Sequence, residues 1–266
     1  MFNWLKKSPY KPTGKRQYAW NPDLPDNRDF SFRAVAPVLS LPQMTDLRPL
    51  CPPVQDQGDL GSCTAHALTG AVEVLEAIDK LPVIMMSRLF VYFNERTLEH
   101  TVNQDAGAQL RDGIKALAQW GCCPETDWPY NPKVFTKKPS CQAFKDGAAH
   151  KITSYQRLTT LDDMKGCLAA GFPFVFGFTV YESFESPDVA KTGIVPMPAS
   201  TERCLGGHAV LGVGYNDSKQ CFIVRNSWGP QWGLAGYFML PYSYAGNQNL
   251  ATDFWTIRRG NLLLKR

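Results

Sequence analysis

A short polar turn that leads directly into a buried helix constrains this chain more than any other stretch of its sequence. Residues 53–67 read Pro-Val-Gln-Asp-Gln-Gly-Asp-Leu-Gly-Ser-Cys-Thr-Ala-His-Ala. Two glycines, Gly58 and Gly61, allow the chain to bend sharply. Apolar residues then recur at three- and four-residue spacing, which predicts a helix with one buried face that begins at Cys63. The recurring positions are Ala67, Leu68, Ala71, Val72, Leu75 and Ile78.

A cysteine at the first turn of a helix is expected to be a reactive thiol. The first-turn N–H groups are unpaired and the helix macrodipole adds partial positive charge, so a thiolate is stabilised and the pKa of Cys63 should fall. Acyl transfer also needs a base beside the sulfur and donors for an oxyanion. Gln57 lies just upstream and can supply a side-chain N–H, and the backbone N–H of Cys63 can supply a second.

Four short motifs in one order resemble the active-site blocks of papain-like cysteine peptidases. They are Gln57-Gly58, Gly61-Ser62-Cys63, Gly207-His208-Ala209 and Asn226-Ser227-Trp228-Gly229. A cysteine followed roughly 130–150 residues later by a histidine and an asparagine is the papain-type spacing. The resemblance covers most of the chain, from Asp46 to Ile257. It implies an α+β fold of two lobes, one helical and one an antiparallel barrel-like sheet, with the active-site groove between them.

The resemblance also implies a role for each matching residue. Cys63 would be the nucleophile of an endopeptidase acting on peptide or protein substrates, His208 the general acid and base, Asn226 the group that orients His208, and Gln57 an oxyanion donor. Trp228 and Trp232 would cover the bond between His208 and Asn226. Glycines would line the groove, and strand residues would shape a substrate pocket. The glycines are Gly61, Gly107 and Gly207, and the pocket candidates are Phe178, Val180 and Tyr181.

The chain divides into an arm and a catalytic region. Residues 1–45 contain six prolines and no persistent period, which predicts an extended arm. We interpret the arm as a short prosegment that crosses the groove and inhibits the enzyme as a zymogen. A plain surface extension is the alternative. Residues 46–266 form the predicted peptidase domain, with a mainly helical lobe over 46–146, a mainly β lobe over 147–257 and a basic tail over 258–266.

Local signals place the main elements. Ser87 can cap a helix over 88–98, a third helix carries Leu110, Ile114 and Leu117, and Gly121 ends it. Thr160 begins a short helix. Strand-like runs follow, at residues 174–180, 209–215, 222–225, 237–240 and 254–257, with a weaker run at 152–158.

Composition excludes several classes of protein. The net charge is only +4 and no block of five like charges occurs, so no nucleic-acid partner is expected. No apolar run is long enough to span a membrane, and the N-terminus lacks the apolar core of a standard signal peptide. This leaves a cytoplasmic location or export by a non-standard route. Eight cysteines without a Cys-x-x-Cys pair predict no metal site, and we expect no cofactor. We expect mostly reduced thiols and an intracellular bacterial origin.

Three other functions fit parts of this pattern. The same fold could transfer the acyl group to another acceptor, as a transglutaminase, amidase or acetyltransferase. The groove could instead be inactive and bind peptides, although no catalytic residue is lost here. A thiol redox protein is disfavoured because no Cys-x-x-Cys pair exists. Of the remaining histidines, His66 could approach Cys63 but is expected in lobe packing, while His100 and His150 are expected to be exposed.

Overall fold

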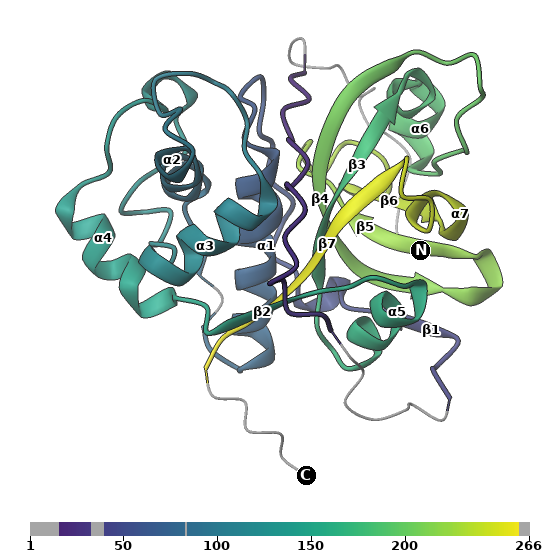
Figure 1. Cartoon of the computed structure of the whole chain (residues 1–266), viewed down its shortest axis with the longest axis horizontal. Helices are drawn as coiled ribbons and strands as arrows, with labels where there is room; N and C mark the ends of the chain where they lie inside the picture. The colour runs from purple at the N-terminus through teal and green to yellow at the C-terminus, as the bar shows by residue number, and fades with distance from the viewer. Residues whose placement is uncertain (1–15, 33–39, 83, 261–266) are drawn as a thin grey trace, which may run out of the picture.

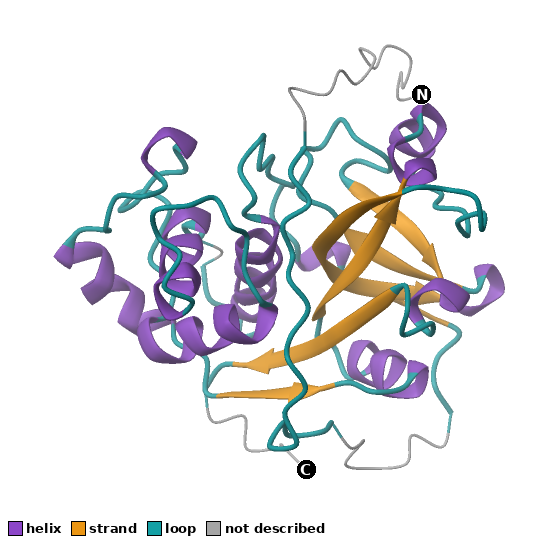
Figure 2. Cartoon of the chain, turned by 45° about the horizontal axis from the view of Figure 1, so that its top comes forward, coloured by secondary structure: helices purple, strands orange, loops and turns teal. Residues whose placement is uncertain are grey.

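A computed structural model describes residues 16–32, 40–82 and 84–260 of the chain. Helices gather on one side and an antiparallel sheet on the other, and an extended N-terminal segment runs between them (Figures 1 and 2). The helical side holds α1 (Cys63–Ile78), α2 (Arg88–Leu98), α3 (Leu110–Trp120) and α4 (Cys141–Gly147). Three further helices lie with the sheet (Figure 1): α5 (Leu161–Ala169), α6 (Pro187–Thr192) and α7 (Tyr242–Ala245).

The sheet has the order β2-β7-β3-β4-β5-β6, and β1 pairs with β4 beside this path. It is therefore an open path of strands in the described part of the chain, whereas the sequence favoured a barrel-like form. The first strand spans the predicted boundary of the arm and belongs to the sheet rather than to the helices. The strands are β1 (Met44–Asp46), β2 (Ser154–Arg157), β3 (Phe174–Tyr181), β4 (Cys204–Asn216), β5 (Cys221–Arg225), β6 (Tyr237–Pro241) and β7 (Ala251–Arg258).

Capping residues set the helix boundaries where the sequence predicts them. The Ser87 hydroxyl accepts a hydrogen bond from the Phe90 N–H, which satisfies one of the free donors at the start of α2. Thr160 and Asp163 form a reciprocal capping box at the start of α5. Gly121, with a φ of 75°, ends α3 in a conformation that a side chain disfavours.

The N-terminal segment that the structure describes, residues 16–32, is an extended strand-like arm (Figures 1 and 2). Its backbone bonds to both sides of the molecule. The Trp20 N–H donates to the Gly207 carbonyl of β4 at 3.0 Å, and the Asn21 N–H donates to the Ala108 carbonyl just before α3 at 3.1 Å. Residues 1–15 and 33–39 of the predicted prosegment, and 261–266 of the predicted tail, lie outside the described residues.

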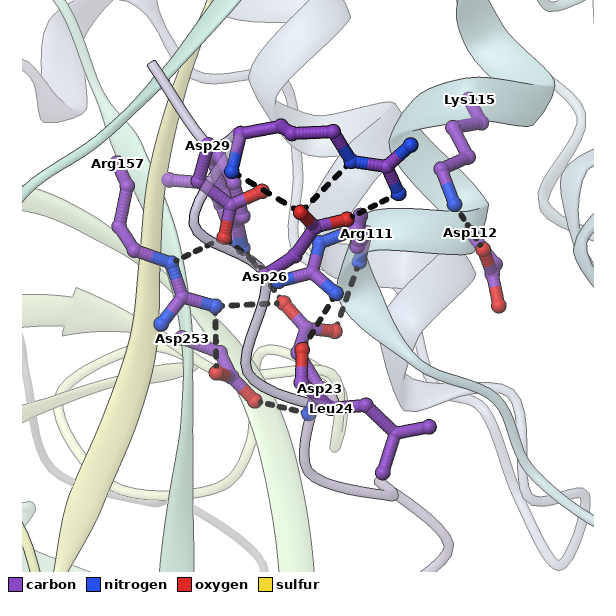
Figure 3. A network of polar contacts seen from close by, with 11 residues as sticks. Asp23, Leu24, Asp26, Asp29, Arg111, Asp112, Lys115, Arg157 and Asp253 are labelled. Carbon is purple, nitrogen blue, oxygen red and sulfur yellow. Dashed lines mark hydrogen bonds and ion pairs between the residues drawn. The ribbon is translucent and has the colours of Figure 1, made fainter. Parts of the chain in front are cut away.

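A buried carboxylate fixes the arm below this crossing (Figure 3). Asp23 accepts hydrogen bonds from the Arg111 backbone N–H at 3.1 Å and the Trp255 indole N–H at 2.8 Å. Its carboxylate also pairs with Arg157 at 3.1 Å, and its own N–H donates to Asp253 at 2.7 Å. Because Arg111 belongs to α3 and the other three belong to β2 and β7, one arm residue joins both sides of the molecule.

Further along the arm, Asp29 repeats this arrangement (Figure 3). Its carboxylate pairs with Arg111 at 2.6 Å and with Arg157 at 3.2 Å. The Arg111 guanidinium also donates to the Leu24 carbonyl at 2.6 Å. Two arginines therefore hold three carboxylates, those of Asp23, Asp29 and Asp253. Within the described ranges, no helix is long and apolar enough to cross a membrane.

Candidate active site

Cys63 is the first residue of α1 and is fully buried. Backbone N–H groups of Ala209, Thr64 and Ala19 face its sulfur and each lowers the pKa of the thiol. Burial outweighs them and raises the pKa of Cys63 to about 12. The predicted position at the helix start is therefore observed, but the predicted low pKa is wrong for this state of the chain, because Ala19 of the arm covers the sulfur.

His208 approaches the same site from β4, where it directly precedes Ala209. Its Nε2 lies 2.9 Å from Oδ1 of Asn226, and this oxygen also accepts the Ser227 N–H at 2.8 Å. An oxygen facing Nε2 favours the tautomer with the proton there and leaves Nδ1 as the basic nitrogen. Among the described residues, Nδ1 has no hydrogen-bond partner. The histidine is thus oriented by one nitrogen and has the other available for proton transfer.

Aromatic rings enclose the histidine. The Trp228 ring stacks on it with centroids 5.2 Å apart and planes inclined at 27°, and Trp232 packs edge-on against Trp228 at 5.1 Å. Phe178 meets the imidazole from β3 at 5.8 Å. Burial in these surroundings lowers the pKa of His208 to about 4, although its hydrogen bond with Asn226 acts in the opposite direction. Trp228 therefore lies over the His208 ring, whereas Trp232 packs against Trp228 and has no ring contact with His208 among the described residues.

Gln57 is held by two hydrogen bonds on its buried side-chain amide. The Ser227 hydroxyl donates to Oε1 at 2.6 Å, and Nε2 donates to the Leu60 carbonyl at 2.9 Å. An amide nitrogen carries two hydrogens, so one N–H remains for an incoming oxyanion. Sequence reasoning missed the role of Ser227. Ser227 directly follows Asn226 in the Asn-Ser-Trp-Gly motif, and this position could have indicated that its side chain belongs to the site.

The three glycines predicted to line the groove all meet the arm. A Cβ on Gly61 would lie 2.7 Å from Cβ of Ala19, and one on Gly107 would overlap the Ala19 carbonyl. A Cβ on Gly207 would lie 2.6 Å from Cε3 of Trp20. The groove is therefore lined by bare backbone where an extended chain passes. Phe178 and Val180 are fully buried and Tyr181 is half-buried, and the residue of β3 that meets the arm's Trp20 is Gly177, which the sequence did not indicate.

The other histidines do not join this site. The Nδ1 of His66 lies 2.9 Å from the Ser62 carbonyl, and its ring packs against Tyr130 at 5.1 Å, so it is part of the lobe packing as expected. His100 is exposed, as predicted. His150 is partly buried and lies 2.6 Å from Glu76, which corrects the expectation of an exposed side chain.

All eight cysteines are free thiols, including the adjacent Cys122 and Cys123, which are both buried. No cluster of three or more potential metal ligands occurs within residues 16–32, 40–82 and 84–260.

Comparison with known proteins decides between the functions that the sequence left open. Residues 41–256 match the model of the family described as papain family cysteine protease. The chain belongs to the papain family of cysteine proteases. It is 49% identical over 213 residues to the uncharacterized peptidase C1-like protein L477 of Acanthamoeba polyphaga mimivirus, a match covering 76% of this chain and 68% of that protein. It is 30% identical to mouse pro-cathepsin H over 198 residues, 71% of this chain and 56% of that protein.

Among solved structures, it is similar to xylellain, a cysteine protease from Xylella fastidiosa. The TM-score is 0.83 at 42% identity, with 98% of this chain and 99% of that chain covered. This confirms the papain-like fold and the likeness to a bacterial enzyme. The matches to the two curated relatives span between half and roughly two thirds of those proteins' lengths. Protease chemistry is thereby favoured over thiol redox chemistry and over transfer to other acyl acceptors.

Proposed function

We propose that Cys63 is the nucleophile of this protease and that His208, Asn226 and Gln57 complete its active site. The observation that carries the proposal is the meeting of α1 and β4 at one point. The sulfur of Cys63 faces the N–H of Ala209, the residue next to His208, and Asn226 orients that histidine at 2.9 Å. These contacts come from three separate parts of the chain and support the arrangement of nucleophile, base and orienting group that acyl transfer needs.

In the proposed reaction, Nδ1 of His208 takes the proton of the Cys63 thiol, and the resulting thiolate attacks the carbonyl carbon of a peptide bond. The carbonyl oxygen takes the negative charge and is stabilised by the free Nε2–H of Gln57 and the backbone N–H of Cys63. His208 gives its proton to the departing amine as the C–N bond breaks, which leaves a thioester. The same histidine then takes a proton from water, whose oxygen displaces the sulfur and releases the carboxylic acid.

The arm supports a second part of the proposal, namely that residues 1–45 act as an inhibitory prosegment of a domain formed by residues 46–266. Tyr18 lies edge-on to His208 at 6.3 Å, Ala19 faces the sulfur, and Trp20 bonds to Gly207. A substrate cannot reach Cys63 while these residues stay in place. A relative named as a pro-enzyme, pro-cathepsin H, is consistent with this arrangement. The arm is then an intramolecular competitor of peptide and protein substrates.

One experiment tests both parts. The full chain is incubated under reducing conditions while hydrolysis of a dipeptidyl fluorogenic amide is followed, and its N-terminus is sequenced at intervals. We expect activity to rise as the arm is lost, and Cys63→Ser to stay inactive and intact. Full activity with Met1 retained would contradict inhibition by the arm. No hydrolysis in any form, together with failure of an epoxide inhibitor to label Cys63, would identify a peptide-binding groove rather than a protease. Labelling of Cys63 without hydrolysis of any amide would mean an activated thiol that acts on a different substrate.

A further inference from the structure

His66 lies beside the candidate active site, three residues after Cys63 on α1. It is buried, with 6% of the residue exposed, and its ring packs edge-on against Tyr130. In the described part of the chain, neither ring nitrogen bonds to Cys63 or His208. His66 is therefore a buried titratable residue that the proposed reaction does not use.

The surroundings of the ring determine which nitrogen of His66 carries the proton. Nδ1 lies 2.9 Å from the Ser62 carbonyl oxygen, which can only accept a hydrogen bond. Nδ1 must therefore donate, and in a neutral ring Nε2 is left as an acceptor. Burial, together with the nearby guanidinium groups of Arg88 and Arg225, lowers the pKa of His66 to about 3, so the ring is neutral near pH 7.

Asn226 has the complementary group. Its Oδ1 accepts hydrogen bonds from Nε2 of His208 at 2.9 Å and from the Ser227 N–H at 2.8 Å. These bonds leave the amide nitrogen Nδ2, which can only donate, on the other branch of the side chain. Asn226 is 4% exposed, and among the described residues neither its Nδ2 nor Nε2 of His66 has a hydrogen-bond partner. One buried donor and one buried acceptor therefore remain, and each is costly to leave unpaired.

A small cavity connects these two residues. Residues of α1 and β4 line it, and His66 and Asn226 are both part of its wall. Its volume of about 10 Å³ is at the lower limit for a single water molecule. Buried waters occupy such spaces where they bond to polar groups that have no other partner. A water molecule here can accept a hydrogen bond from Nδ2 of Asn226 and donate one to Nε2 of His66.

We propose that His66 is a positioning residue of this protease, which holds Nδ2 of Asn226 through one water molecule and so keeps Oδ1 turned towards His208. This inference rests on the proposed function, because it concerns the group that orients the proposed base. An amide rotated by half a turn would present Nδ2 to His208 and disfavour the imidazolium, which needs an acceptor. The other nitrogen of His66 holds the carbonyl of Ser62, the residue before Cys63, so one ring links the nucleophile to the orienting group.

The test compares three substitutions that each keep a different part of the histidine. His66→Gln places an oxygen near the position of Nε2 and keeps the acceptor. His66→Asn places an amide N–H near Nδ1 and keeps the donor to Ser62, and His66→Phe keeps only the ring that packs on Tyr130. His100→Asn is the matched control, because His100 is exposed and asparagine tolerates its φ of 59°.

Each full chain is incubated under reducing conditions to release the arm, and kcat is expressed per Cys63 site that an epoxide labels. We expect His66→Gln and the His100→Asn control to have nearly the kcat of the unmodified chain. In His66→Asn and His66→Phe, kcat should be about 5- to 10-fold lower, the ratio for one lost hydrogen bond. KM should change little, because Asn226 acts on the transition state through His208.

The pH profile separates a positioning role from a structural one. The hydrogen bond with Asn226 raises the pKa of His208, so its loss should move the alkaline limb of kcat/KM to lower pH in His66→Asn and His66→Phe, by up to about one unit. His66→Gln should keep the original limb. The other groups that face His208 are the same in every variant, since Arg16 leaves with the arm and Cys63 stays.

A second measurement needs no hydrolysis. In the full chain with ¹⁵N-labelled imidazoles, the resonances of His66 are those that vanish in His66→Gln, and their chemical shifts report which nitrogen carries the proton. We expect the proton on Nδ1 and none on Nε2 between about pH 5 and pH 8. The Nε2 resonance of His208 should shift in His66→Asn and His66→Phe and stay in place in His66→Gln.

Three results would overturn the inference. The first is a normal kcat per labelled site in His66→Phe, because packing of the ring would then suffice. The second is activity that His66→Asn keeps and His66→Gln loses, which would place the role of His66 at Ser62. The third is a proton on Nε2, which would set one donor against another. If the unmodified chain cleaves no amide, the proposed function fails, and the resonances of His66 and His208 still decide whether His66 orients Asn226.

Discussion

In the arm-covered chain, Cys63 is a neutral thiol and His208 a neutral imidazole. Burial disfavours both charged forms and shifts their pKa values apart, to about 12 and about 4. A thiolate–imidazolium pair needs these values in the opposite order. In the proposed mechanism, desolvation therefore favours the unreactive protonation state of both residues while the arm is in place. The amide of Gln57, whose function requires no ionisation, is already fixed in position by Ser227 and Leu60.

Gln57→Ala should lower kcat for a dipeptidyl amide by about 10²- to 10³-fold, because one oxyanion donor is removed. Ser227→Ala should cause a smaller loss, since the Leu60 carbonyl still holds Nε2 of Gln57. Gln55→Ala is the matched control, because the Gln55 amide donates to the Pro53 carbonyl outside the site. Steady-state kinetics after arm removal checks all three. A normal kcat for Gln57→Ala would remove this residue from the mechanism.

At the level of helices and strands, the sequence predicted those boundaries that local residue patterns determine. The hydroxyl groups of Ser87 and Thr160 can cap a helix, which predicted the starts of α2 and α5. The spacing of apolar residues predicted the start of α1 without knowledge of any tertiary contact. For the arm, the sequence predicted an extended chain but not its path across the molecule. That path is set by backbone hydrogen bonds with Gly207 and Ala108, which lie far away in the sequence. The contact of Trp20 with Gly177 and Gly207 could not be predicted either, since these glycines lie on different strands and become neighbours only through strand register.

The arm should detach more readily when Asp23 is changed to alanine. This substitution leaves the backbone N–H of Arg111 and the indole N–H of Trp255 without their acceptor, which costs about 1–3 kcal/mol for each buried group left unpaired. Arg157 loses one partner but keeps Asp29 and Asp253. Cys63 labelling should therefore become faster by at least about tenfold.

Asp26→Ala is the control for this prediction. It removes the same charge from the same arm, but the hydrogen bonds of Asp26 within the described residues join it only to Arg28 and Asp29 of the arm itself. Its labelling rate should match that of the unmodified chain. Equal rates for the Asp23 and Asp26 variants would show that the buried network does not hold the arm.

Viewed as a whole molecule, the protein has two differently built sides that pack on each other through α1 and β4, and a strand-like arm with a charged cluster bridges them. Cys63 comes from the helical side, and His208 and Asn226 come from the sheet. The carboxylates of Asp23 and Asp29 connect the arm to the same two sides, through Arg111 of α3 and Arg157 of β2 (Figure 3). Stability and access to the site are therefore linked through the arm.

This linkage should make stability depend on pH through Asp253. Burial, followed by the nearby carboxylate of Asp23, raises the pKa of Asp253 to about 6, although Arg157 pairs with it at 3.1 Å. The unfolded chain has the ordinary value of about 3.9, so the folded protein binds this proton more tightly. The contribution to stability is thus fully present below about pH 4 and is lost as the pH rises through about 6.

Thermal unfolding between pH 4.5 and 7.5 tests this, with Asp253→Asn as the comparison. Asparagine tolerates the positive φ of 57° at this position, so the variant removes the titration with little backbone strain. The unmodified chain should lose more Tm across this range than the variant, by about 2–4 °C for each kcal/mol of linkage. Glu99, whose pKa is raised to about 7 by burial, titrates in both proteins and cancels in the difference. Parallel Tm profiles would mean that Asp253 is already ionised at low pH and that Arg157 outweighs burial.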